Sequence, residues 1–231
     1  MEQETRQSID FNTIVREIPA TAVKVITNAT TFFREMPKVG GFVEPLIFMV
    51  GIGIVTGVIN FILSLFGVGY AQSFGMALTS IVLTPILVAI FGFVGALILF
   101  LIWKILGSQE SYETAYRCGA YVTAISPITT ILHIIPYLGS ILSLLWMTYL
   151  IVIASSEVHN IQRKKAWIVF GIIFVIFAIM SLTSQFAARR MASRMERFQQ
   201  EMGKQMKDLS PEEARKAAQD LLKQMQQRQQ K

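Results

Sequence analysis

The sequence predicts an all-α polytopic membrane protein, with a five-helix transmembrane bundle and amphipathic N-terminal and C-terminal helices. The first observation is composition: 53% of the 231 residues are hydrophobic and only 16% are charged, which is typical of chains that cross a membrane several times. The second is the length of the uncharged runs, since no Asp, Glu, Lys or Arg occurs in 45–103 or in 118–156. A lipid interior offers no water to the backbone, so such runs satisfy their own hydrogen bonds as helices.

Residues 1–44 are predicted to form an N-terminal amphipathic arm. Apolar residues recur at helical spacing on both sides of Pro19 and end in Phe32 and Phe33, with charged residues between them. This pattern is typical of one or two amphipathic helices that lie on the membrane surface or pack under the bundle. A soluble cap is the alternative.

Residues 45–188 are the predicted transmembrane domain, and polar or turn-forming breaks divide it into spans. A cluster of Gly, Gln and Ser at 67–75 separates the first two spans, and Pro136 with Gly139 marks a tight hairpin turn. At about 1.5 Å per residue, most of these runs match the ~30 Å of a hydrocarbon core. The expected spans are 45–66, 77–103, 114–133, 138–154 and 166–188.

Glycine, asparagine and proline residues inside the spans have expected structural roles. Glycines of the first two spans, Gly53 and Gly57 among them, leave small surfaces that let helix backbones approach each other in lipid. Asn60 is a polar exception, which we expect to form a helix-to-helix hydrogen bond rather than to bind a ligand. Pro127 predicts a kink in the third span.

Residues 189–231 are predicted to form an amphipathic helical tail, which carries most of the net charge of +6. A second helix of this tail begins at Ser210, where Pro211 and Glu213 complete an N-terminal capping pattern. Each helix has a narrow apolar stripe, so the two are expected to pair as a coiled coil, with a second copy, or with a membrane surface. The stripes are Met191, Met195, Phe198, Met202 and Met206, and then Ala214, Ala217, Ala218, Leu221, Leu222 and Met225.

The distribution of Lys and Arg predicts the sidedness of the spans. Basic residues precede the first span, flank the loop between the second and third, and follow the fourth, whereas the loops near Gly69 and Pro136 have none. Positively charged loops stay in the cytoplasm, so the N-terminus is predicted to be cytoplasmic. Five spans then place the tail on the opposite side, although the arginines after Ala188 favour the cytoplasm.

Four ionisable residues near the span ends are candidates for function. Glu113 and Arg117 are four apart at the start of the third span, so they share a helical face and are expected to form an ion pair. Glu157 returns to the same side at the end of the fourth span, and His159 follows it. Ionisable groups close to a membrane are candidate functional residues, with anchoring of helix ends at the headgroups as the alternative.

The sequence contains no catalytic pattern of the kinds found in soluble enzymes: no phosphate-binding glycine loop, no paired cysteines and no His-x-x-x-His. His133 and His159 lie at opposite ends of the predicted hairpin, and Glu157 and His159 lie on different faces of a helix. The single cysteine, Cys118, is expected to be a packing residue. We therefore predict no catalytic residue, no metal, no cofactor and no nucleic-acid partner.

Three ordered stretches carry a family resemblance. They are TTFFREMPKVGGFVEPLIF, SYETAYRCGAYVTAISPI and HIIPYLGSILSLLWMTYLIVIASSEVHNIQRKKAWIV. Together they resemble the Yip domain family, named for interaction with Ypt/Rab GTPases, and its prokaryotic branch in particular. The resemblance covers about 30–185 and implies a five-helix membrane domain with a cytoplasmic N-terminus. Eukaryotic relatives are associated with Rab GTPases and vesicle traffic, but their Asp-Leu-Tyr-Gly-Pro motif is absent here, which argues against Rab recruitment.

These observations favour a non-enzymatic membrane scaffold or adaptor, of the membrane organisation or trafficking type, with the amphipathic arms as contact surfaces. Its expected partners are the lipid bilayer and, through the C-terminal helices, another protein or a second copy. A conduit for a small solute or lipid is the alternative, motivated by the glycines and Pro127. An intramembrane enzyme would require Glu113, Glu157 and His159 to converge.

Overall fold

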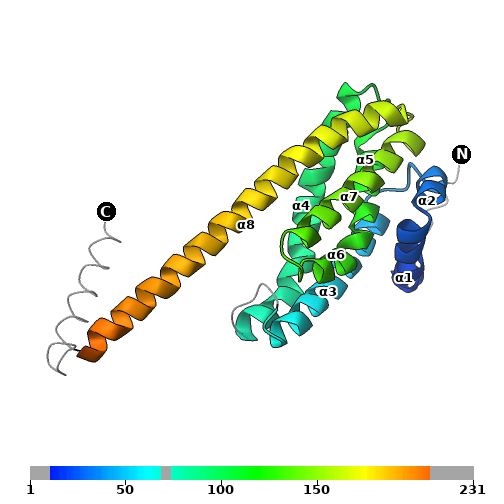
Figure 1. Ribbon diagram of the computed structural model, residues 1–231. Helices are drawn as coiled ribbons and strands as arrows, with labels where there is room; N and C mark the ends of the chain where they lie inside the picture. Colours follow the sequence, from blue (N-terminus) through cyan, green and yellow to red (C-terminus); the bar gives the residue numbers. More distant parts are fainter. Residues whose placement is uncertain (1–10, 69–73, 209–231) are drawn as a thin grey trace, which may run out of the picture. The chain divides into compact units, whose positions relative to one another are not determined.

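The computed structural model describes residues 11–68 and 74–208, and the regular elements of this part are all helices, which confirms the all-α prediction (Figure 1). The chain forms two compact units, Met1–Ser181 and Leu182–Lys231, and α8 contributes residues to both. The elements in order are α1 (Phe11–Thr27), α2 (Ala29–Glu35), α3 (Val43–Leu65), α4 (Phe74–Ile105), α5 (Tyr112–Val122), the 3₁₀ turn η1 (Thr123–Ile125), α6 (Ser126–Leu132), α7 (Leu138–Glu157) and α8 (Arg163–Asp208).

Four helices within the described residues are long and apolar enough to cross a membrane. They are Val43–Leu65, Gly75–Ile105, Leu138–Glu157 and Arg163–Lys204. The expected third span, 114–133, is not one helix, because α5 ends at Val122 and α6 starts only after η1. Pro127 lies in the first turn of α6, where its missing N–H leaves no carbonyl without a donor. The expected third span is therefore interrupted at η1 and not only kinked. A count of five spanning helices is not confirmed.

Helices α3 and α4 pack closely through the glycines of α3. A side chain on Gly53 would place its Cβ 2.8 Å from the Cα of Pro85, and one on Gly57 would lie 2.8 Å from the carbonyl oxygen of Ser80. No side chain fits at either position without moving the facing backbone, so the predicted packing role is confirmed for these two residues. Gly95 in α4 has open space beside it and makes no such contact.

The hairpin predicted around Pro136 is confirmed by the turn between α6 and α7. Gly139, in the first turn of α7, lies directly against the carbonyl group of Leu132, where any Cβ would collide with it. Tyr137 adopts a positive φ of 63° just before α7 begins. A glycine at this point therefore permits the close return of the chain.

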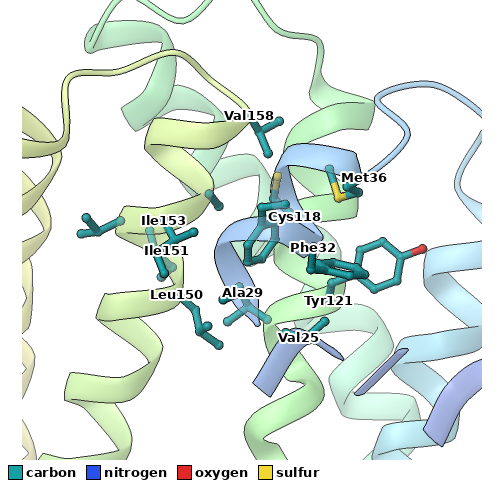
Figure 2. Close-up of a cluster of buried hydrophobic side chains, with 14 of the residues drawn as sticks. Val25, Ala29, Phe32, Met36, Cys118, Tyr121, Leu150, Ile151, Ile153 and Val158 are labelled. Carbon is teal, nitrogen blue, oxygen red and sulfur yellow. The ribbon is translucent and has the colours of Figure 1, made fainter. Parts of the chain in front are cut away.

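The arm contributes to the core of the first unit. Figure 2 shows Val25 of α1 with Ala29 and Phe32 of α2, among side chains of α5 and α7. The ring of Phe32 lies edge-on to Tyr121, with 5.0 Å between ring centres. Residues of the arm are thus as fully buried as those of the apolar helices themselves.

The first helix of the arm lies along α3. Ile18 points at Gly51, more than two turns from the start of α3, where a Cβ would approach its Cδ1 to 2.6 Å. The residues of α1 that face inward follow a helical stripe, and the outward face leaves Phe11, Val15 and Val23 exposed. α1 is therefore packed on the flank of α3.

Candidate functional site

Polar groups from three loops and from the adjoining helix ends meet at one end of the first unit, and we call them the polar cluster. The loops are those before α3, between α4 and α5, and between α7 and α8. Lys38 connects all three, since its Nζ lies 2.7 Å from Glu110 Oε1 and donates to the carbonyl oxygen of Val158 at 3.1 Å. The cluster is Arg34, Lys38, Gly41, Glu44, Ser108, Glu110, Glu113, Thr114, Arg117, Glu157, His159 and Arg163.

Arg117 is fully buried, which is unusual for an arginine and needs compensation. It forms an ion pair with Glu44 at 2.7 Å and donates to the carbonyl oxygen of Gly41 at 3.1 Å. Tyr121 also donates to Glu44, at 3.2 Å. The Nε of Arg117 is buried without a hydrogen-bond partner in the described chain. These contacts hold the start of α3 against α5.

The predicted ion pair between Glu113 and Arg117 is wrong. Glu113 instead accepts a hydrogen bond from the backbone N–H of Gly41 at 2.6 Å, while Arg117 binds the carbonyl oxygen of the same residue. The two side chains thus share a helical face, as the spacing requires, but both are used to hold one turn of backbone.

Gly40 and Gly41 make this turn possible. Their φ angles are +135° and +83°, a region that side-chain-bearing residues rarely adopt. A Cβ on Gly40 would also lie 3.4 Å from a guanidinium nitrogen of Arg117. The glycine pair therefore lets the backbone wrap over a buried cation.

Glu157 joins three helices. Its two carboxylate oxygens bind Arg34 of α2 at 2.9 Å and Arg163 of α8 at 3.0 Å, and its side chain is only 13% exposed. Both arginines are exposed, so the pairs fix the position of helix ends more than they add stability. The carboxylate of Glu157 is therefore occupied by two cations of the protein itself.

His159 is buried in a pocket of ring and hydroxyl groups. Its Nδ1 lies 2.8 Å from the hydroxyl of Ser108, and its ring stacks on Trp103 with 3.9 Å between centres. Trp103 in turn donates to Ser155 at 2.8 Å. Burial, together with the charges of Lys38 and Lys104, lowers the pKa of His159 to about 3, so the imidazole is neutral at physiological pH.

The predicted site residues therefore fall into two groups. Glu113, Arg117, Glu157 and His159 all lie in the polar cluster. Glu113 and Arg117 both bind the backbone of Gly41, Glu157 binds two arginines, and His159 contacts Ser108. Asn60 and Pro127 lie elsewhere, in α3 and α6. Asn60 Oδ1 is buried, and no partner for it occurs among the described residues, so the expected helix-to-helix hydrogen bond is not seen at this atom.

Sequence reasoning missed Lys38, Glu44, Glu110 and Ser108 as members of the cluster. The clearest signal for them is the adjacent glycine pair at 40–41, which marks a special backbone conformation between two charged residues. No group of three or more His, Cys, Asp or Glu side chains suited to a metal ion occurs in 11–68 or 74–208.

The sequence model of the Yip1 domain family matches residues 23–184. The chain belongs to the Yip1 domain family. The matched region contains the whole polar cluster and the helices of the first unit from the end of α1 onward. The Yip1 domain is thus a multi-pass membrane domain whose first matched residues, near Val25, are already part of its core. No curated protein and no solved structure gave a significant match.

Proposed function

We propose that this Yip1 domain protein is a non-enzymatic membrane scaffold or adaptor, of the membrane organisation or trafficking type. The proposal rests on the contacts that the charged groups of the polar cluster make. Its charged groups bind one another and the backbone of loops, so they fasten the arm and the helix ends together. A domain whose helix ends are joined in this way, with helical appendages, is suited to presenting contact surfaces.

The partners of the acidic and imidazole groups argue for this role over catalysis. Glu113 holds a backbone N–H, Glu157 holds two arginines, and His159 is neutral and stacked on an indole. A general acid or base must have a proton-accepting atom within reach of a substrate. In this cluster those atoms already bind groups of the protein itself.

The conduit alternative is not favoured by any observation. Its motivation was the glycines and Pro127, but Gly53 and Gly57 lie against α4, and Gly51 lies against Ile18 of α1. Pro127 lies in the first turn of α6, where its missing N–H leaves no carbonyl group without a donor. These residues therefore have packing roles.

We further propose that the broken segment α5–η1–α6 crosses the membrane as a fifth, interior span. Thr114 and Arg117 of α5 belong to the polar cluster, and so does Glu157 at the far end of α7. If α7 spans the membrane toward the cluster, the segment before it must have crossed in the opposite direction. Its 21 residues, from Tyr112 to Leu132, cover about 30 Å, and much of α5 is buried in protein, which shields its polar groups from lipid.

This arrangement supports a cytoplasmic polar cluster, because Lys and Arg gather in its loops and are missing from the loops at the other ends of the helices. With five crossings, the tail after Ala188 lies on the opposite side. The tail also falls outside the family match, so it is the part that gives this chain its own partner or self-association.

The experiment compares the full chain with a variant that lacks residues 191–231, both purified in mild detergent. We expect the full chain to carry a co-purifying protein or to form a larger complex, and the shortened chain to lose it. The melting temperature of the shortened chain is the control, since the family match ends at residue 184, before the deletion, and we expect the domain to stay folded. A complex of unchanged composition and mass would contradict the proposal.

A further inference from the structure

The second unit contains an exposed stripe of small and apolar residues on α8. They recur three or four residues apart, a spacing that keeps them on one face of the helix. The stripe consists of Ser184, Ala188, Met191, Met195, Phe198 and Met202. Met191, Met195 and Phe198 are 69%, 51% and 54% exposed, so nothing in the described part of this unit covers them.

The spacing of the stripe is that of a coiled-coil seam. Its steps are alternately four and three residues, so the pattern repeats every seven residues, and the two apolar positions of such a repeat are called a and d. The a positions are Ala188, Met195 and Met202, and the d positions are Ser184, Met191 and Phe198. A helix that rests on a lipid surface has a wider apolar face. The narrow stripe therefore favours a helical partner.

The hollow on this face matches the way in which coiled-coil helices interlock. It has a volume of about 550 Å³, and four of the residues that line it are Met191, Arg194, Met195 and Phe198. Four residues at this spacing, i, i+3, i+4 and i+7, form the hole into which one side chain of the facing helix inserts. In a parallel pair of identical helices, the inserted side chain is Met195 of the second copy. The stripe is thus complementary to itself.

We propose that the stripe binds the same stripe of a second copy, so that the α8 helices of two chains form a parallel coiled coil over residues 184–204. Copies that cross one membrane share the same orientation, because the same loops stay on the same side, and this makes their α8 helices parallel. Confinement to one bilayer also raises the effective concentration of one copy near another.

The charges of this segment are compatible with such a pair. Most of them lie at the outer positions b and c, namely Arg189, Arg190, Glu196, Arg197 and Lys204. Positions e and g flank the seam, and in a parallel pair a g residue faces an e residue of the partner. The e positions, Gln185, Ala192 and Gln199, are uncharged. Arg194 and Glu201, at g, therefore meet no like charge across the seam of residues 184–204.

A second copy as the partner of the tail is a special case of the proposed function and rests on it, but the two can fail separately. Deletion of residues 191–231 could release a different protein while the stripes of two copies make no contact. That result would leave the scaffold role standing and overturn the coiled coil. The test of the coiled coil therefore uses the purified chain alone.

The test introduces single cysteines into the full chain, in a Cys118→Ala background that removes the native thiol. Met195→Cys places a thiol on the seam, where it lies opposite its own copy. The matched control, Gln200→Cys, places a thiol on the opposite face of the same helix, five residues later. We expect disulfide-linked dimers to form in mild detergent at least about tenfold faster at position 195 than at position 200.

Two results would overturn the proposal. Equal rates at the two positions, or no dimers at either, would show that the stripes do not meet. A seam thiol that forms no dimer, and is protected from a water-soluble maleimide only by vesicles with anionic lipid, would assign the stripe to a membrane surface.

A second measurement does not depend on disulfide geometry. Phe198→Glu places a charge on the seam, and Gln200→Glu places the same charge on the opposite face. We expect light scattering in detergent to give a protein mass of two chains for the natural protein and for Gln200→Glu, and half that mass for Phe198→Glu. An equal mass for all three proteins would contradict the coiled coil.

Discussion

At the scale of single residues, the Yip1 domain tolerates a buried cation because two acceptors bind it. Arg117 is fully buried, yet Glu44 and the backbone of Gly41 take two of its nitrogens. Glu44 is about half exposed, so the pair keeps one side near water. A buried arginine at the end of a span is therefore a link between chain segments 73 residues apart.

Replacement of this arginine by an uncharged residue of similar length tests the link. Arg117→Met removes both hydrogen bonds and leaves Glu44 without its cation, so we expect a loss of about 1–3 kcal/mol of unfolding free energy. The melting temperature in detergent measures it. Arg163→Met is the control, since that arginine is exposed and its loss should cost less than about 1 kcal/mol. Equal effects of the two variants would contradict the assigned role.

The buried imidazole gives a pH dependence whose sign follows from its pKa. His159 lies in the loop between α7 and α8, and burial lowers its pKa to about 3 in the folded protein. The unfolded chain takes up a proton below about pH 6.5, and the folded chain does not, so acid favours unfolding. The loss of stability starts below pH 6.5 and grows until about pH 3.

We expect up to about 2 kcal/mol to be lost between pH 7 and pH 5 through this residue. The measurement compares melting temperatures at the two pH values for the natural protein and for His159→Gln. Glutamine can still bond to Ser108 but does not titrate in this range. The variant should therefore show a smaller pH dependence, and an unchanged one would show that other groups cause it.

At the scale of elements, the sequence predicts long apolar helices well and broken ones poorly. Helices α3, α4 and α7 follow directly from their length and hydropathy. The break at η1 was signalled by Pro127, but a proline in a membrane helix is equally compatible with a kink. The ion pair expected from the spacing of Glu113 and Arg117 failed for a different reason. The competing partner, the backbone of Gly41, lies more than 70 residues away, and no local pattern reveals it.

The contact between α3 and α4 gives a prediction at the same scale. Gly57→Ala would place a Cβ 2.8 Å from a backbone oxygen of α4, so the helices must separate. We expect a loss of about 1–3 kcal/mol, as for other overpacked contacts. Gly95→Ala adds the same methyl group to α4 where the space is open, and it should be neutral or slightly stabilising. Thermal unfolding of both variants in one detergent measures the difference.

At the scale of the whole molecule, the polar cluster holds the ends of several helices together. Lys165 at the start of α8 donates to the carbonyl oxygen of Leu106 at 3.1 Å, just after α4. Ser108, in the loop between α4 and α5, contacts His159 after α7. The ends of α4 and α7 and the starts of α5 and α8 are thus held together. The chain from α5 to α7 must therefore lead away from the cluster and come back to it.

The side of the membrane on which the C-terminus lies therefore tests whether α8 makes the fifth crossing. Helix α8 starts at the cluster and contains the last apolar run, so the five crossings that we propose require the C-terminus to lie on the opposite side of the membrane. A reporter enzyme active only in the cytoplasm should be active when fused after Gln109, in the loop between α4 and α5, and inactive when fused after Lys231. Activity at both positions would mean that α8 does not cross. Both tail and cluster would then face the cytoplasm, in line with the arginines that follow Ala188.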